Sequence, residues 1–179
     1  MTAHVLDIQL DPPPRAVLGC IQTATDFVLD SEGPELVRGI PGVELRLQKL
    51  VFDNDSITPA TFRRAASNIG RAAATLRPVS RLTAVGLACT SMSFILGPDQ
   101  IAAELCGACP DAATTDMAQA QVAALAALGA RRVSLLTPYI EEVSIANAKT
   151  ITDAGFQIVR RCTMELAKDE QTSRVSPDC

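Results

Sequence analysis

A cysteine followed by small and hydroxyl-bearing residues stands at the end of an apolar segment. Cys89-Thr90-Ser91-Met92-Ser93-Phe94 follows residues 82–88, a run typical of a strand buried on both faces of a parallel sheet. Because Gly97-Pro98 comes next, we expect the Cys89 thiol to lie over a helix N-terminus, where backbone N–H groups and the helix dipole favour a thiolate and bind anions. Such a thiolate could serve as a nucleophile or a base. The alternative is that Cys89 is only a small apolar residue of the core.

The composition and charge of the chain narrow the class of protein. Of the 179 residues, 47% are hydrophobic and 20% are charged, which is typical of a compact soluble protein with a sizeable core. A net charge of −4 and a single histidine argue against a nucleic-acid partner. The apolar runs are strand-sized or interrupted by charge, and the N-terminus lacks a basic segment followed by an apolar one. We therefore expect no membrane span, no signal peptide and a cytoplasmic location.

The other cysteines offer a second possible chemistry. Cys106 and Cys109 have the CxxC spacing of redox and metal sites. We expect no metal site, because no second such pair occurs and His4 is the only imidazole. The pair also precedes Pro110 after a predicted helix, whereas a thioredoxin-type pair lies at a strand-to-helix turn. In a cytosolic protein free thiols are expected at all six positions, which are Cys20, Cys89, Cys106, Cys109, Cys162 and Cys179.

Strands and helices are predicted to alternate along the chain. Thr58-Pro59 and Gly97-Pro98 each begin a helix, and Asp116 is the expected N-cap of an Ala-rich one. Gly129 and Gly155 are expected just beyond helix ends. Strands are predicted at 16–21, 43–52, 82–88, 133–136 and 156–159, with helices after Thr58-Pro59 as far as Pro78, after Gly97-Pro98, over 116–129 and over 140–154.

This alternation predicts an α/β fold with right-handed crossovers and a parallel sheet. Ligands of such sheets bind beyond the carboxyl ends of the strands. The segments expected there are the loop after Ile21, the Cys89 segment and a turn at Thr137-Pro138-Tyr139, all of them rich in hydroxyl groups. No glycine-rich phosphate-binding motif appears, so a nucleotide cofactor is not indicated.

Several of these motifs together resemble one known family. The chain from about Ala16 onward resembles the Asp/Glu racemase superfamily, within it the branch of maleate cis–trans isomerases, arylmalonate decarboxylases and ectoine-utilisation proteins. The cysteine segment and Leu136-Thr137-Pro138-Tyr139, in that order, form the most specific pair. The other matching segments are Ala24-Thr25-Asp26-Phe27 with Asp30 and Glu32, Ile57-Thr58-Pro59, Thr114-Thr115 and residues 126–132.

The resemblance implies a flavodoxin-like fold of two similar α/β lobes, each with a small parallel sheet, that face each other across a cleft. Residues 1–115 would form the first lobe with Cys89, and residues 116–179 a partial second lobe with Tyr139. It also implies a small carboxylate substrate, no metal or organic cofactor, and assembly into a homo-oligomer. An incomplete second lobe would leave a sheet edge and apolar helix faces uncovered, which also predicts self-association.

Roles for individual residues follow from the same resemblance. Cys89 matches the first catalytic cysteine, and Thr90 and Ser91 match residues whose hydroxyls and amides hold a substrate carboxylate or enediolate. Tyr139 matches a cleft tyrosine that donates to a carboxylate. Thr23, Thr25 and Asp26 are also expected to contact the substrate. The residues alone leave alternatives to some of these roles. Tyr139 could only pack against its neighbours, and Thr23 and Thr25 could only form hydrogen bonds within their loop. Thr114 and Thr115 are expected to cap the following helix.

Three departures from the family pattern bear on activity. Asp26 stands where the family usually has an asparagine, and Glu170 is expected at a second amide position. The second catalytic cysteine of the family would lie beyond the end of this chain, and Cys179 does not match it because Ser-Pro-Asp rather than an apolar strand precedes it. The sequence is therefore expected to be a fragment or a shortened relative, without two-base racemisation.

The resemblance implies a cofactor-independent isomerase or racemase acting on a small (di)carboxylate, with Cys89 as nucleophile or base. Arylmalonate decarboxylases have glycine at the position of Cys89, so the cysteine favours an isomerase of the maleate type. Two alternatives stay open. The first is a carboxylate-binding or ectoine-utilisation accessory protein without turnover, and the second is an arylmalonate-type decarboxylase.

Overall fold

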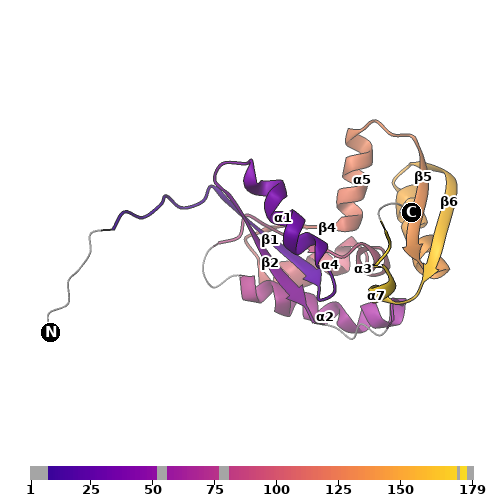
Figure 1. The fold of residues 1–179 in the computed structure, drawn as a ribbon, viewed down its shortest axis with the longest axis horizontal. Coiled ribbons are helices and arrows are strands. Elements are labelled where there is room, and N and C mark those ends of the chain that lie inside the picture. Colours follow the sequence, from indigo (N-terminus) through magenta and orange to yellow (C-terminus); the bar gives the residue numbers. More distant parts are fainter. Residues whose placement is uncertain (1–7, 52–55, 77–80, 173, 177–179) are drawn as a thin grey trace.

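A parallel sheet of four strands forms the first part of the fold (Figure 1). The computed structural model describes residues 8–51, 56–76, 81–172 and 174–176, so His4 and Cys179 lie outside the described residues. The strand order is β2-β1-β3-β4, and every neighbouring pair is parallel. The strands are β1 (Ala16–Thr23), β2 (Val43–Leu50), β3 (Ala84–Ala88) and β4 (Ala113–Asp116).

Helices connect these strands and cover the sheet. The predicted N-caps are confirmed: the Thr58 hydroxyl accepts from the Thr61 N–H at 3.3 Å, and Asp116 Oδ1 accepts from the N–H groups of Ala118 and Gln119 at 2.8 and 3.1 Å. The helices of this part are α1 (Val28–Arg38), α2 (Pro59–Leu76), α3 (Thr90–Leu96), α4 (Pro98–Ala108) and α5 (Met117–Ala127). None of the helices in the described ranges is long and apolar enough to cross a membrane.

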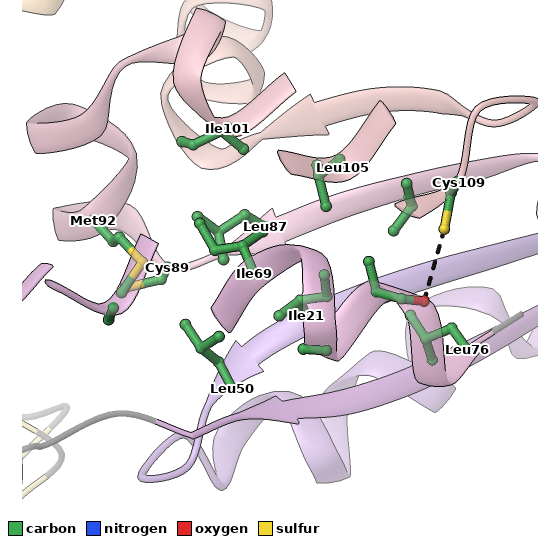
Figure 2. Packing of buried hydrophobic residues seen from close by; sticks show 14 of the residues in the cluster. Ile21, Leu50, Ile69, Leu76, Leu87, Cys89, Met92, Ile101, Leu105 and Cys109 are labelled. Atoms are coloured by element: carbon green, nitrogen blue, oxygen red, sulfur yellow. Dashed lines mark hydrogen bonds between the residues drawn. The ribbon is translucent and has the colours of Figure 1, made fainter. Parts of the chain in front are cut away.

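The main hydrophobic core lies between the sheet and helices α2, α3 and α4. Figure 2 shows Ile21 of β1 and Leu87 of β3 packed with Ile69 of α2, and these side chains are almost completely buried. Cys89 and Met92 lie at one end of this cluster (Figure 2). The packing of the core therefore determines where the thiol is held.

A second, two-stranded parallel sheet follows α5. It has its own small core around Leu135, Ile151 and Phe156. Its elements are β5 (Arg132–Tyr139), α6 (Glu141–Asp153) and β6 (Gln157–Leu166), after which comes the one-turn helix α7 (Asp169–Thr172). The predicted α/β class is confirmed as a four-stranded and a two-stranded parallel sheet, whereas the division into lobes at residue 115 stays a prediction.

The second sheet exposes apolar side chains. Leu136 of β5 is 64% exposed, and Val159 and Met164 of β6 are also exposed. Exposed apolar side chains on a short sheet are a feature of surfaces that associate with other chains. They agree with the expectation of self-association, which stays a prediction.

Four expectations about local structure were wrong. Thr137-Pro138-Tyr139 belongs to β5 and is not a turn, because β5 stays paired with β6 as far as Tyr139. The helix N-terminus next to the cysteine belongs to α3, which begins at Thr90, whereas the helix expected after Gly97-Pro98 is confirmed as α4. Thr114 and Thr115 lie in β4 and pair with β3. The last strand runs to Leu166 rather than ending at residue 159. Gly129 and Gly155 do lie beyond helix ends, with φ of 66° and 92°.

Candidate active site

A cavity of about 500 Å³ lies at the carboxyl ends of β1, β3 and β5. All seven residues expected to contact substrate from the sequence line it: Thr23, Thr25, Asp26, Cys89, Thr90, Ser91 and Tyr139. The structure therefore brings together three segments that are far apart in sequence: the loop after β1, the start of α3 and the end of β5. Seven further residues complete the wall, and these are Phe27, Val28, Phe62, Ala88, Asp169, Thr172 and Arg174.

Cys89 is the N-cap residue of α3. Its extended backbone (φ −135°, ψ 105°) ends β3 and turns the chain into the helix. The Met92 backbone N–H donates a hydrogen bond to the thiol sulfur, and the Ser91 hydroxyl lies 3.7 Å from it. The Ser93 hydroxyl donates to the Cys89 carbonyl oxygen at 2.8 Å, which strengthens the first turn. The sulfur is thus held in one position at the cavity wall by the turn that follows it.

Burial dominates the protonation of this thiol. It raises the pKa of Cys89 to about 11, against the lowering effect of the hydrogen bonds from Met92 and Ser91, and the charges of Asp169 and Asp26 raise it further. The Met92 N–H at the helix N-terminus does lower this pKa, as expected, but burial outweighs it and the net shift is upward. α3 has seven residues, and the dipole of two turns offsets only part of the cost of burying a charge. The sulfur is a thiol at neutral pH.

Tyr139 lies at the carboxyl end of β5, beside the cysteine. Its hydroxyl is hydrogen-bonded to the Thr90 side chain, and burial raises the pKa of Tyr139 to about 12. The register between β5 and β6 shifts between Thr137 and Tyr139, and such irregularities redirect the side chains next to them. The Thr163 hydroxyl of β6 also donates to the Tyr139 carbonyl. Tyr139 is therefore a protonated hydroxyl that can donate into the cavity.

The loop after β1 supplies hydroxyl and carboxylate groups. The Asp26 backbone N–H donates to the Thr23 carbonyl at 3.1 Å, and Asp26 Oδ1 accepts from the Leu29 N–H at 3.0 Å, which orders the start of α1. The Thr25 hydroxyl donates to Asp169 Oδ2 and lies 3.4 Å from the Thr23 hydroxyl. These bonds place three polar side chains of the loop at the cavity.

Asp169 and Arg174 are cavity residues that sequence reasoning missed. The sequence was expected to place Glu170 at the site, but Asp169 lines the cavity, while the Glu170 side chain is 77% exposed and pairs with Arg174 at 3.4 Å. Burial and the charge of Asp26 raise the pKa of Asp169. One feature of the sequence indicates that these residues lie near the site, which is their position after the last strand. The four polar residues of α7 form a single helical turn and show no hydrophobic periodicity that would predict a helix.

The chemical resources of the cavity are a thiol, hydroxyl donors and two carboxylates. The hydroxyls of Thr90, Ser91 and Tyr139 each carry one O–H. Ser91 now contacts the Cys89 sulfur and Thr90 contacts Tyr139, so a bound anionic oxygen would receive donors turned away from these partners. The thiol can form a covalent bond once it is ionised. Within the described ranges, no three residues of the kinds that ligate metals are grouped together.

Comparison with known proteins gives one family and a set of similar folds. A family model described as arylmalonate decarboxylase matches residues 30–178. A cysteine-to-alanine mutant of the maleate isomerase Iso from Pseudomonas putida, solved with maleate, has a TM-score of 0.79 at 18% identity, covering 91% of this chain and 69% of the isomerase. No curated protein sequence matches the chain.

Two further structures share the fold. A mutant of the maleate cis-trans isomerase of Nocardia farcinica, with a covalently bound succinylcysteine intermediate, has a TM-score of 0.76 at 20% identity, with 91% of this chain and 69% of that chain covered. A double mutant of arylmalonate decarboxylase in the liganded form, with one glycine changed to cysteine and one cysteine to serine, has a TM-score of 0.71 at 24% identity. The match covers 90% of this chain and 67% of the decarboxylase.

Proposed function

This chain belongs to the arylmalonate decarboxylase family, and from that premise we propose that it is a cofactor-independent isomerase or racemase-type enzyme of the maleate isomerase kind, with Cys89 as its nucleophile or base. Its substrate is a small molecule with at least one carboxylate. The observation that carries the proposal is the position of the Cys89 sulfur, held by Met92 and Ser91 at the wall of a cavity with three hydroxyl donors.

The isomerisation proceeds through a thiol adduct. The Cys89 sulfur, once ionised, forms a bond to one alkene carbon, and the π-electron pair moves toward the carboxylate next to the other carbon, which becomes an enediolate. The former double bond is then single and can rotate. The enediolate electrons re-form the double bond as the carbon–sulfur bond breaks, and the sulfur leaves as a thiolate.

The neighbouring side chains fit the charge that this reaction develops. Thr90, Ser91 and Tyr139 line the cavity with hydroxyl groups that can donate hydrogen bonds to enediolate oxygens. The thiol proton must leave before the attack, because the raised pKa keeps Cys89 protonated at neutral pH. The proton leaves to solvent, and the negative charges of Asp26 and Asp169, which line the same cavity, oppose this ionisation.

The test is conversion of maleate to fumarate, followed by proton NMR, together with mass spectrometry of the protein for a succinyl adduct on Cys89, which forms where a proton from solvent reaches the enediolate carbon before the carbon–sulfur bond breaks. We expect turnover and an adduct in the wild type, and a loss of at least about 100-fold in Cys89→Ser. Cys162→Ser is the matched control, because Cys162 is an exposed thiol on β6. Equal turnover by wild type and Cys89→Ser would overturn the proposal.

Two other functions are separated by the same experiment. The protonated thiol favours a carboxylate-binding protein without turnover, which would bind maleate and give neither fumarate nor adduct. The family match favours an arylmalonate-type decarboxylase, which would release carbon dioxide from phenylmalonate in a Cys89-dependent reaction.

A further inference from the structure

Acidic side chains outnumber basic ones in the described part of the cavity wall. Asp26 and Asp169 both line it, and both raise the pKa of the Cys89 thiol, so their charge acts at the place where a substrate would react. Arg174 is the one basic side chain of the cavity wall among the residues that the structure describes. Its guanidinium is 76% exposed and pairs with Glu170, so it neutralises the inner carboxylates poorly.

Each of the two carboxylates keeps one oxygen for a ligand. Asp169 uses Oδ2 to accept from Thr25, and Asp26 uses Oδ1 to accept from the Leu29 N–H. In the described part of the chain, no hydrogen bond or ion pair involves Asp169 Oδ1 or Asp26 Oδ2. Thr25 links the two acids, since it precedes Asp26 and donates to Asp169.

Lys49, which contacts the backbone of the Asp26 loop, forms its ion pair with another acid. Lys49 Nζ lies 2.7 Å from Asp30 Oδ2, 5.3 Å from the centre of the Phe27 ring, and donates to the backbone carbonyl of Asp26 rather than to its carboxylate. This arrangement holds the base of the loop, and in the part of the chain that the structure describes neither Asp26 nor Asp169 forms an ion pair. A dicarboxylate would then bring a second negative charge next to two others in a partly buried site, which weakens its binding relative to a ligand with one carboxylate.

We propose that the cavity selects a substrate with one carboxylate and, a few bonds away, an ammonium or comparable cationic group, which Asp26 and Asp169 bind together. This inference rests on the proposed function and narrows its substrate class. The carboxylate is bound by the hydroxyls of Thr90, Ser91 and Tyr139, next to the Cys89 sulfur. The cationic group supplies the charge that the acid pair lacks.

The test compares two ligands of matched size by isothermal titration calorimetry at about pH 8. One is maleate, and the other is the cis-aminocrotonate in which an aminomethyl group replaces one carboxylate of maleate. We expect the wild-type protein to bind the aminocrotonate at least about tenfold more tightly. Calorimetry measures binding alone, so this result can be obtained even where the isomerase test fails.

Variants establish the cause of the preference. Asp26→Asn and Asp169→Asn keep the shape of each side chain and should each reduce the preference, and the double variant should reverse it. Asp99→Asn is the matched control, since Asp99 is exposed at the start of α4 and outside the cavity wall. Circular dichroism checks that each variant is folded.

Three outcomes would overturn the inference. Equal or tighter binding of maleate by the wild type contradicts it while leaving the proposed function intact. A preference that persists unchanged in the double variant also contradicts it. Binding of neither ligand overturns this inference together with the carboxylate-binding part of the proposed function.

Discussion

The Thr25 hydroxyl donates a hydrogen bond to the Asp169 carboxylate, which lies 144 positions further along the sequence. A second long-range bond, from the Ile57 N–H to the Ala167 carbonyl at 2.9 Å, joins the same region to the segment before α2. Figure 1 shows α7 following β6 and returning to the first part of the molecule. Because α7 has a single turn and no buried residue, these bonds determine where Asp169 lies.

Thr25→Val removes the first of these bonds with little change in side-chain shape. We expect faster backbone hydrogen exchange over residues 167–172 and a free energy of unfolding lower by about 1 kcal/mol. Hydrogen exchange followed by mass spectrometry measures the first effect, and urea denaturation the second. Thr152→Val is the control, because its hydroxyl donates only to the Ala148 carbonyl within α6. Unchanged exchange over 167–172 would show that other contacts hold α7.

The reactivity of Cys89 should rise steeply with pH. With a pKa of about 11, its alkylation rate should increase about tenfold per pH unit and show no plateau up to about pH 10. Asp169→Asn removes a negative charge that raises this pKa, so the rate at a given pH should increase. Mass spectrometry of peptides alkylated with iodoacetamide gives the rate at each cysteine, with the exposed Cys106 as internal reference. A plateau below pH 8 would mean that the thiol ionises readily, as a helix N-terminus would cause.

Gly86 in β3 lies close to β4, and a side chain there would disturb the strand that ends at the site. A Cβ would come within 2.9 Å of Thr115 Cγ2 and 3.4 Å of the Thr115 carbonyl oxygen. We expect Gly86→Ala to lower the free energy of unfolding by about 1 to 3 kcal/mol, measured by urea denaturation. Thr115→Ser removes the contacting methyl group, so it should restore part of this loss in the double variant.

Gly107 is the matched control for this substitution. A Cβ there meets nothing within 4 Å, and the residue lies in the last turn of α4. Gly107→Ala should therefore raise the free energy of unfolding by about 0.5 to 1 kcal/mol, because alanine loses less backbone entropy on folding. A similar loss in both variants would refute the explanation by contact with Thr115.

The Arg161–Glu141 pair makes a pH-dependent contribution to the second sheet. Arg161 donates to both Glu141 oxygens, and this hydrogen bonding lowers the pKa of Glu141. Because the pKa is lower in the folded state, the stabilisation is present above the ordinary glutamate pKa and is lost as the pH falls through the lowered value. An NMR titration of Glu141 should show its midpoint rise in Arg161→Gln. Arg160→Gln, at the neighbouring position, should leave the midpoint unchanged.

Several parts of the fold could be predicted because their signals are local. Thr58 and Asp116 are N-caps whose side chains bond to N–H groups within three residues, and Gly129 and Gly155 have the positive φ that favours glycine after a helix. Four elements were not predicted, and two of them, α3 and α7, are helices of only seven and four residues. Pro34 and Gly33 obscure the helical pattern of α1, and β4 has only four residues.

The sequence by itself determined which side chains stand at the carboxyl ends of the strands. Cys89 after an apolar strand and Thr23 and Thr25 after another could be placed at one edge of a parallel sheet, because that edge collects all such ends. The positions of Asp169 and Arg174 at the cavity could not be predicted from the sequence, because they depend on the direction in which the chain leaves β6. The protonation of Cys89 was decided by tertiary structure as well. A local helix terminus favours the thiolate, but burial at the end of the hydrophobic core opposes it, and burial is a property that only the folded chain has.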